Sequence, residues 1–262
     1  MRPPAGELER KLRAKRDAGH KLLVPYVTAG MTPDWLEVVH AVAVAGADAV
    51  EIGIPFSDPM IDGPTIQRAS VMALEGGATP AGILGSLRHA EVGVPLVAMT
   101  YYNIVFRAGH RRFACSLIES GVSGAIVPDL PLEEAREWCD EADRAGVETV
   151  LLVAPSTSDE RAERICARSH GFVYGVGLMG VTGERARLSA SAAGVARRLK
   201  QMTDLPVCIG IGVSTPGQAA EVCVEADGVV VGSALVRRLL EGAGPDGAAE
   251  FVAGLRSGID AA

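Results

Sequence analysis

Short apolar runs recur along the chain, and within each run the apolar residues are continuous rather than alternating with polar ones. There are eight of them: Leu22 to Thr28, Ala49 to Ile54, Leu96 to Tyr101, Ala125 to Pro128, Thr149 to Ala154, Phe172 to Gly177, Val207 to Ile211 and Gly228 to Gly232. Such runs are typical of strands in a parallel sheet that is covered on both faces. The pattern therefore predicts eight buried parallel strands.

Amphipathic, alanine-rich segments with helix signals lie between these runs. Typical helix starts are found at Thr32 to Asp34, Pro131 to Glu134 and Ser214 to Pro216. Glycines stand where helices should end, at Gly46, Gly121 and Gly146. A left-handed glycine at that position satisfies the last helical carbonyls, so each repeating unit is predicted to be a strand followed by a helix.

Eight strand–helix units in 262 residues match the size of a closed (β/α)8 barrel, the TIM barrel fold. We expect residues 1–262 to form a single domain of this fold with extra helices. A doubly wound open sheet is the alternative. It is disfavoured because no linker divides the chain and no G-x-G-x-x-G motif follows the first strand.

Two predicted connections are longer than the usual βα loop of about two to six residues. One runs from Pro55 to Gly63 after the second strand, and the other from Gly180 to Ser189 after the sixth. Both follow the carboxyl ends of strands, where barrel enzymes place their active sites. We therefore expect both long loops to be functional.

The composition narrows the classes of function. Hydrophobic residues make up 48% of the chain, as in ordinary folded proteins. The longest apolar stretches are far shorter than the roughly 18 residues of a membrane span, and the first residues have no apolar signal segment. We therefore expect a cytoplasmic protein with no membrane partner. The net charge of −7 argues against a nucleic-acid partner.

The cysteines and histidines indicate no metal site. The five histidines occur singly, without metal-ligand spacing. An odd number of cysteines without a C-x-x-C pair indicates free thiols in a cytosolic chain. We expect all five to pack in the core: Cys115, Cys139, Cys166, Cys208 and Cys223.

Two acidic residues are candidates for chemistry. Glu51 lies inside the second apolar run, where an ionised carboxylate is costly to bury without a partner. It is either a structural carboxylate, bonded to amides or an arginine, or a general acid or base whose pKa the apolar surroundings raise. Asp62 follows 11 positions later. Alone it is typical of a helix N-cap or an Asx turn, but with Glu51 it could act on opposite sides of one substrate.

Three glycine-rich turns follow the last three strands. They are Gly180 to Gly183, Gly210 to Ser214 and Gly232 to Ala234, and the last of them opens a helix. Glycine permits close backbone approach, and amides at a helix N-terminus bind a phosphate without a cationic side chain. The turns after strands seven and eight form the recurrent phosphate site of this barrel, so we expect a phosphorylated substrate.

Several segments resemble the tryptophan synthase alpha subunit family, in the expected order over nearly the whole chain. The most specific is Glu51 to Gln67, and the others are Val27 to Gly30, Met99 to Asn103, Val127 to Pro131, Gly180 to Gly183 and Gly210 to Ser214. The resemblance implies a TIM-barrel lyase that cleaves indole-3-glycerol phosphate to indole and glyceraldehyde 3-phosphate. This retro-aldol reaction needs no metal or cofactor in the alpha subunit.

The resemblance also implies roles for individual residues. Glu51 protonates C3 of the indole ring and helps deprotonate the glycerol hydroxyl, while Asp62 accepts a hydrogen bond from the indole N–H. Tyr174 matches a tyrosine near the catalytic glutamate, and Thr182 matches a mobile-loop threonine that orients the aspartate. The pocket wall is matched by Tyr26, Ile66 and Tyr101, and the phosphate cradle by Gly183, Gly212, Gly232 and Ser233.

The chain departs from the family pattern in three places. Met31 stands in the turn where the family usually has an aspartate, and Gly177 to Met179 replaces a more polar stretch. Ile211 takes the place of a phenylalanine that packs on the indole. Both acids and the phosphate turns are kept.

The implied partner is a pyridoxal-phosphate-dependent beta subunit, in an alpha2-beta2 heterotetramer that makes tryptophan. Two alternatives remain. One is a lyase that acts alone and releases free indole. The other is a non-catalytic activator that binds a ligand and switches a partner enzyme, which the presence of both acids disfavours.

Overall fold

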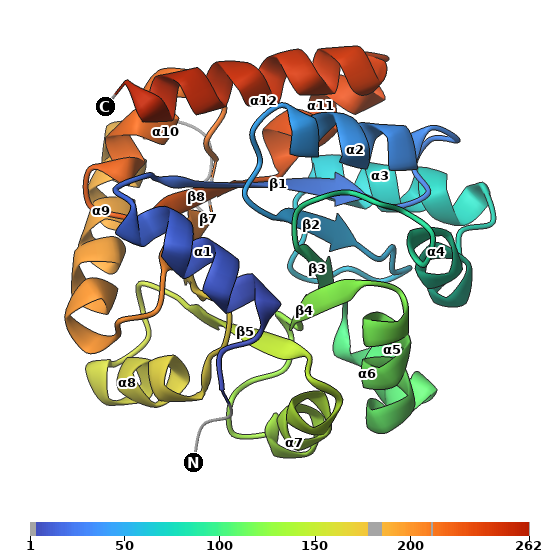
Figure 1. The fold of residues 1–262 in the computed structure, drawn as a ribbon, viewed down its shortest axis with the longest axis horizontal. Helices are drawn as coiled ribbons and strands as arrows, with labels where there is room; N and C mark the ends of the chain where they lie inside the picture. Colours follow the sequence, from blue (N-terminus) through green and yellow to red (C-terminus); the bar gives the residue numbers. More distant parts are fainter. Residues whose placement is uncertain (1–3, 178–184, 211, 262) are drawn as a thin grey trace.

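The computed structural model describes residues 4–177, 185–210 and 212–261, which form a closed barrel of parallel strands in the order β1-β2-β3-β4-β5-β6-β7-β8 (Figure 1). The strands are β1 (Leu22–Thr28), β2 (Val50–Gly53), β3 (Leu96–Met99), β4 (Val122–Ile126), β5 (Glu148–Val153), β6 (Val173–Val176), β7 (Val207–Gly210) and β8 (Gly228–Val231). The predicted TIM barrel is confirmed and the open sheet is wrong, because β8 pairs with β1. That residues 1–262 form one domain stays a prediction.

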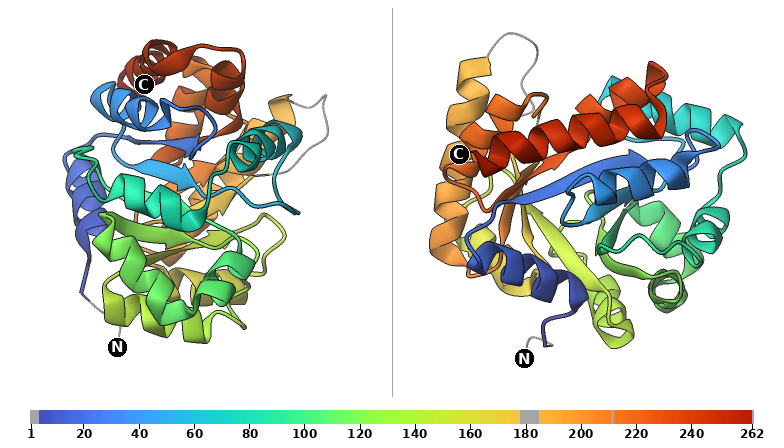
Figure 2. Two further views of the ribbon diagram at one scale, coloured as in Figure 1. Left: turned by 90° about the vertical axis from the view of Figure 1, so that its right-hand side faces the viewer. Right: turned by 45° about the horizontal axis from the view of Figure 1, so that its top comes forward.

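Helices surround the barrel, and α12 runs beside α2 along one side (Figure 2). The helices are α1 (Glu7–Asp17), α2 (Trp35–Val44), α3 (Pro64–Glu75), α4 (Pro80–Leu87), α5 (Tyr102–Ala108), α6 (His110–Glu119), α7 (Arg136–Ala145), α8 (Asp159–Arg168), α9 (Arg185–Met202), α10 (Pro216–Cys223), α11 (Ser233–Leu240) and α12 (Gly244–Asp260). Among the described residues, no helix is long and apolar enough to cross a membrane.

The predicted helix boundaries are confirmed at three glycines that follow helices and at the N-cap of one helix. Gly46, Gly121 and Gly146 all have positive φ. Thr215 caps α10, since its side chain accepts a hydrogen bond from the Gln218 amide. The helix-start pattern at Pro131 to Glu134 predicted the beginning of α7 too early, because α7 begins only at Arg136.

Strand β4 begins three residues before its predicted start, at Val122 rather than Ala125. Ser123 and Gly124 have low strand propensity, so the pattern missed them. A Cβ at Gly124 would lie 2.9 Å from the Leu8 side chain and 3.2 Å from the Glu148 carbonyl oxygen. A small residue is required there because α1 packs against this part of the barrel.

The two long loops differ in how well the sequence predicted them. No helix or strand lies between β2 and α3, as expected for the segment from Pro55 to Gly63. The second predicted loop extends too far, because α9 already begins at Arg185. Its earlier part, residues 180–184, lies outside the described residues.

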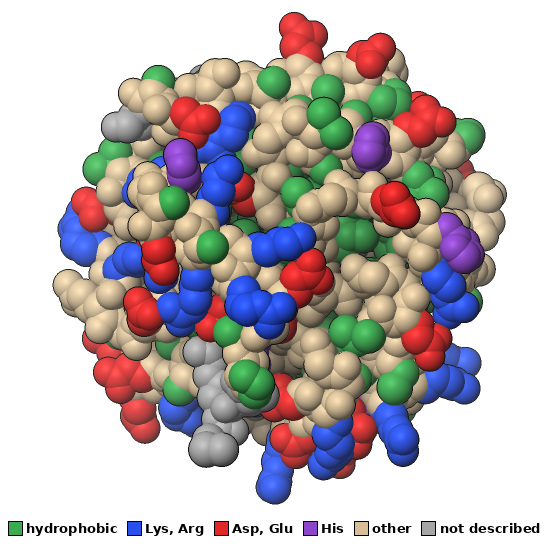
Figure 3. All heavy atoms as spheres, in the orientation of Figure 1, with side chains coloured by type: hydrophobic (Ala, Val, Ile, Leu, Met, Phe, Trp, Pro, Cys, Tyr) green, Lys and Arg blue, Asp and Glu red, His purple; other side chains and the backbone are tan. Residues whose placement is uncertain are grey.

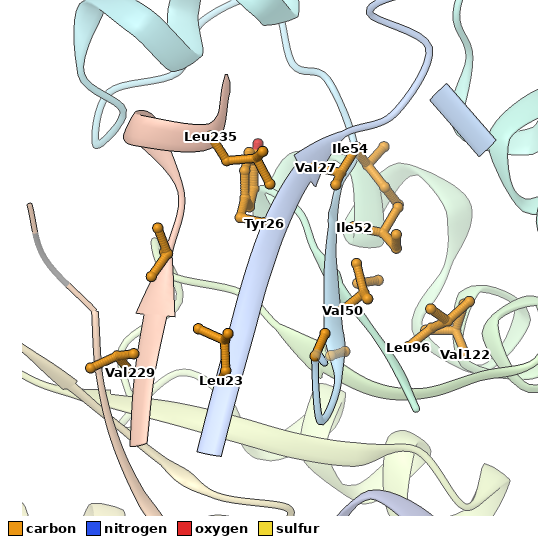
Figure 4. Packing of buried hydrophobic residues seen from close by; sticks show 14 of the residues in the cluster. Leu23, Tyr26, Val27, Val50, Ile52, Ile54, Leu96, Val122, Val229 and Leu235 are labelled. Atoms are coloured by element: carbon orange, nitrogen blue, oxygen red, sulfur yellow. The ribbon is translucent and has the colours of Figure 1, made fainter. Parts of the chain in front are cut away.

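Buried side chains form an inner and an outer layer. The inner layer fills the barrel with alternate strand residues such as Val24, Val97 and Phe172. The outer layer packs the strands against the helices, and Figure 4 shows part of it around β1, β2 and β8. Because both faces are buried, the strands read as continuous apolar runs.

Helix α1 closes the end of the barrel that faces the viewer in Figure 1. Its Leu8 and Leu12 are fully buried in the inner layer. The amides of Leu8 and Glu9 donate to the Glu148 carboxylate at 2.7 and 2.9 Å. This carboxylate satisfies two of the free amides at the helix N-terminus, so Glu148 fixes α1 onto β5.

The surface agrees with the charge balance of the sequence. Figure 3 shows acidic and basic side chains interspersed over one face. Four of the five cysteines are buried, as expected, but Cys115 is exposed. The prediction was wrong for Cys115 because α6 buries Phe113, Ala114 and Leu117, which leaves residue 115 on the side of the helix that faces solvent.

Candidate active site

Glu51 points into the barrel beside Tyr26, its register partner on β1. The side chain is 1% exposed, and its Oε2 atom has no hydrogen-bond partner among the described residues. Burial, with a smaller contribution from the Asp62 charge, raises the pKa of Glu51 to about 8. The carboxyl group is therefore mostly protonated at neutral pH, which removes most of the cost of burying it. It can donate a proton.

The structural alternative for Glu51 finds no support in the described part of the chain. There, no arginine or lysine forms an ion pair with Glu51, and no hydrogen bond engages its Oε2 atom. Glu148 shows what a structural carboxylate looks like in this barrel, since both of its oxygens accept backbone amides. Glu51 has the environment of a group that exchanges protons.

Asp62 lies in the loop between β2 and α3, close to Glu51 in space. The N-cap of α3 is Gly63, so the interpretation of Asp62 as that cap is wrong. Gln67 donates to the Asp62 carbonyl oxygen at 2.8 Å and fixes its backbone. Burial raises the pKa of Asp62, and the Tyr101 hydroxyl partly offsets this rise.

A cavity of about 230 Å³ joins the two acids. It is lined by Tyr26, Glu51, Ile61, Asp62, Gly63, Ile66, Met99, Pro128, Leu152, Tyr174, Val176, Gly210, Gly212, Val230, Gly232 and Ser233. The wall is mostly apolar, and its ionisable groups are the two carboxyl groups and the hydroxyls of Tyr26 and Tyr174. Such a cavity suits a flat aromatic ring with one polar edge.

Most of the predicted site residues meet in this cavity. Tyr101 does not line it, and its hydroxyl instead accepts a hydrogen bond from the loop. Thr182, Gly183 and Ile211 lie outside the described residues. The remaining predicted residues are cavity-lining residues: Tyr26, Glu51, Asp62, Ile66, Tyr174, Gly212, Gly232 and Ser233.

Among the strand residues of the cavity wall, sequence reasoning missed four apolar ones, Met99, Leu152, Val176 and Val230. Leu152 is the register partner of Tyr174, and Met99 is that of Gly53. These residues share the inward face of the barrel with Tyr26 and Tyr174. The period-two alternation of strand side chains, counted from Glu51 or Tyr174, could have identified them.

Two tyrosines of the cavity wall each pack over a glycine of the next strand. A Cβ at Gly53 would lie 1.9 Å from the Tyr26 hydroxyl oxygen, and a Cβ at Gly210 would lie 2.0 Å from that of Tyr174. Glycine in these strands therefore makes room for the rings. Burial raises the pKa of both tyrosines, so their hydroxyls stay neutral.

Another part of the cavity wall is formed by the glycine turns after β7 and β8. Gly212 has a φ of +51°, and Gly232 is the N-cap of α11, whose first residue is Ser233. The described lining residues include no lysine or arginine. A phosphate here would be held by backbone amides and by the positive end of the helix dipole.

Metal-binding groups are not clustered in the described residues, which contain no set of three or more His, Cys, Asp or Glu side chains that could hold a metal ion. The arrangement brings two carboxyl groups and the glycine turns after β7 and β8 together around an apolar cavity. Fold and site together define a (β/α)8-barrel protein whose cavity holds two carboxyl groups toward the carboxyl ends of the strands.

Comparison with known proteins identifies the family. The sequence model of the tryptophan synthase alpha chain matches residues 12–253. The alpha chain of Streptomyces coelicolor is 44% identical over 256 residues, which are 95% of this chain and 94% of that protein. The alpha chain of Methanosarcina mazei is 45% identical and covers 92% of this chain and 88% of that protein. The chain belongs to the tryptophan synthase alpha chain family.

Solved structures support the same family assignment. Tryptophan synthase of Mycobacterium tuberculosis in space group F222 has a chain with a TM-score of 0.90 and 36% identity, covering 98% of this chain and 99% of that one. The alpha subunit of Legionella pneumophila has a TM-score of 0.91 at 31% identity, covering 99% and 100%. The chain is accordingly a lyase of tryptophan biosynthesis that cleaves indole-3-glycerol phosphate.

Proposed function

We propose that Glu51 and Asp62 carry out this cleavage in the cavity between them. Glu51 donates its proton to C3 of the indole ring, which leaves the positive charge on the indole nitrogen. The Glu51 carboxylate left by this step then helps remove the proton of the glycerol hydroxyl, the carbon–carbon bond breaks, and its electron pair returns to the ring, so that Glu51 regains its proton. The products are indole and glyceraldehyde 3-phosphate, and the proton balance is even.

One observation supports this proposal above all others: a fully buried carboxyl group with a pKa of about 8 shares an apolar cavity with a second acid. Carbon protonation needs an acid held against the ring face. Asp62 faces the same cavity and stabilises the charge that develops on the indole nitrogen. The roles of Thr182 and Gly183 in orienting Asp62 and holding the phosphate stay predictions.

The phosphate is proposed to lie against the amides of Gly212, Gly232 and Ser233. Replacing Gly212 with valine should raise KM for the phosphorylated substrate by about tenfold or more. A β-branched residue is strained at a φ of +51°, and its side chain would occupy the cradle. Steady-state kinetics with the phosphorylated substrate and with its dephosphorylated analogue would measure this effect.

Gly146→Val is the matched control. It places the same side chain at a positive φ of +86°, at the end of α7 and outside the cavity. Both variants should lose stability, but only Gly212→Val should affect phosphate binding. An equal loss on both substrates in a folded Gly212→Val protein would show that this glycine serves the barrel and not the phosphate.

We further propose that the chain passes indole to a beta subunit in an alpha2-beta2 complex in the cytoplasm. The family assignment supports this, since tryptophan synthase joins the two reactions. Pyridoxal phosphate belongs to the beta subunit in this scheme. The alpha chain needs no cofactor of its own, because an acid, a base and a charge partner for the indole nitrogen are sufficient.

Indole release measured with and without a beta subunit tests this scheme. Slow cleavage by the chain alone, stimulated when the beta subunit is added, is the expected result. Full activity alone and no stimulation would instead support a lyase that acts by itself. Binding of substrate without any cleavage would support the non-catalytic activator.

A further inference from the structure

Tyr101 has an unusual place among the predicted site residues. It lies two residues beyond the end of β3, is almost fully buried, and does not line the cavity. Its ring stacks on Phe56, with ring centroids 5.1 Å apart and an angle of 24° between the planes. Its hydroxyl oxygen accepts a hydrogen bond from the Ile61 amide at 3.2 Å. Tyr101 thus contacts the loop between β2 and α3 at two points.

We propose that Tyr101 is a positioning residue that holds this loop so that Asp62 faces the substrate cavity. The inference rests on the proposed role of Asp62 in cleavage. In this role Tyr101 supports a catalytic group and is not part of the wall that contacts the substrate.

The rest of the loop has few other supports. Between the two contact points, Ser57 and Asp58 are exposed, and Met60 is 86% exposed. Buried packing therefore does not hold this part of the loop in place. Gln67 from α3 fixes the Asp62 carbonyl oxygen, while Tyr101 holds the amide of Ile61, the residue before Asp62. The two contacts hold the backbone just before Asp62 and just after its Cα atom.

The hydroxyl also lies beside the Asp62 carboxylate. Within the described part of the chain, the titratable groups that face Asp62 are Glu51 from β2, Tyr26 from β1, Tyr174 from β6 and Tyr101 itself. Of these, the Tyr101 hydroxyl lowers the pKa of Asp62 and so opposes the effect of burial. Tyr101 therefore favours the ionised form that a developing cation requires.

Tyr101→Phe removes the hydroxyl and keeps the ring. We expect kcat for indole release to fall about tenfold, the rate equivalent of one lost hydrogen bond, with a change in KM of less than about threefold. Without the hydroxyl the pKa of Asp62 rises, so the acidic limb of the kcat profile should move to higher pH. Hydrogen exchange of the Ile61 amide should become faster.

Tyr102→Phe is the matched control, because it removes the hydroxyl of the next residue, which is hydrogen-bonded to His110 at 3.1 Å. Its kcat, pH profile and Ile61 exchange should equal those of the wild type. An unchanged acidic limb in Tyr101→Phe would overturn the proposal, and so would a raised KM at constant kcat, which would indicate a substrate contact.

The role of Tyr101 and the proposed function can be refuted separately. Wild-type protein that does not cleave indole-3-glycerol phosphate would refute the proposed function. The exchange rate of the Ile61 amide does not depend on cleavage. An unchanged rate in Tyr101→Phe would refute the role of Tyr101 even in a fully active enzyme.

Discussion

Replacing Glu51 with glutamine should lower the rate of indole-3-glycerol phosphate cleavage by about 10²- to 10⁴-fold, the usual contribution of a general acid or base. Glutamine has nearly the same size and can still form hydrogen bonds, but it cannot donate a proton to carbon. Glu51 is the acid that β2 presents to the cavity, and its pKa of about 8 keeps the proton available at neutral pH. Steady-state indole release measures the loss.

The stability of this variant gives an independent check of the same pKa. The pKa of Glu51 is raised from an ordinary 4.5 to about 8 in the folded protein. Between these values the unfolded chain ionises while the folded protein stays protonated, so rising pH lowers the stability of the wild type. Glutamine does not titrate. The melting temperature of Glu51→Gln should therefore rise relative to the wild type from pH 5 to pH 8.

Glu148→Gln provides the control for burial. Glu148 is also buried in the barrel, but its carboxylate holds two amides of α1 and lies away from the cavity. This variant should lose stability and keep its kcat while folded. If Glu51→Gln retained activity within a factor of a few of the wild type, its role as the proton donor would be wrong.

Replacing Asp62 with asparagine should lower kcat by about 10² to 10³-fold, as expected when a group that stabilises transition-state charge is removed. The carboxylate is needed mainly when the indole nitrogen becomes positive, so KM should change only a few-fold. The loop itself should stay in place, because Gln67 and Tyr101 hold backbone atoms that the substitution leaves intact. Initial rates over a range of substrate concentrations separate kcat from KM.

Asp58→Asn is the control in the same loop, since Asp58 is exposed and does not line the cavity. It removes the same charge and should leave indole release by the chain alone unchanged. A raised KM at constant kcat in Asp62→Asn would make Asp62 a ground-state contact, contrary to the proposed role.

The alternation of apolar strands and amphipathic helices was sufficient to predict the barrel. Because both faces of each strand are buried, the strand residues are apolar without interruption, and β1 begins and ends where the sequence pattern placed it. Glu51 was identifiable for the same reason, as a carboxylic acid in such a run. Strand β4 was placed less well, because packing against Leu8 requires a small residue at Gly124.

The properties of the candidate site depend on contacts between residues far apart in the chain. The raised pKa of Glu51 comes from closure of the barrel around it and from Asp62, neither of which sequence spacing can quantify. The sequence resemblance placed Tyr101 in the pocket wall. In the structure its hydroxyl instead accepts a hydrogen bond from the Ile61 amide of the loop, 40 positions away in the chain. Hydrophobic periodicity is a local property, whereas desolvation and hydrogen bonding arise when distant segments meet. The chain pattern therefore determined the architecture and the candidate acids, and only the folded barrel decided their protonation and their neighbours.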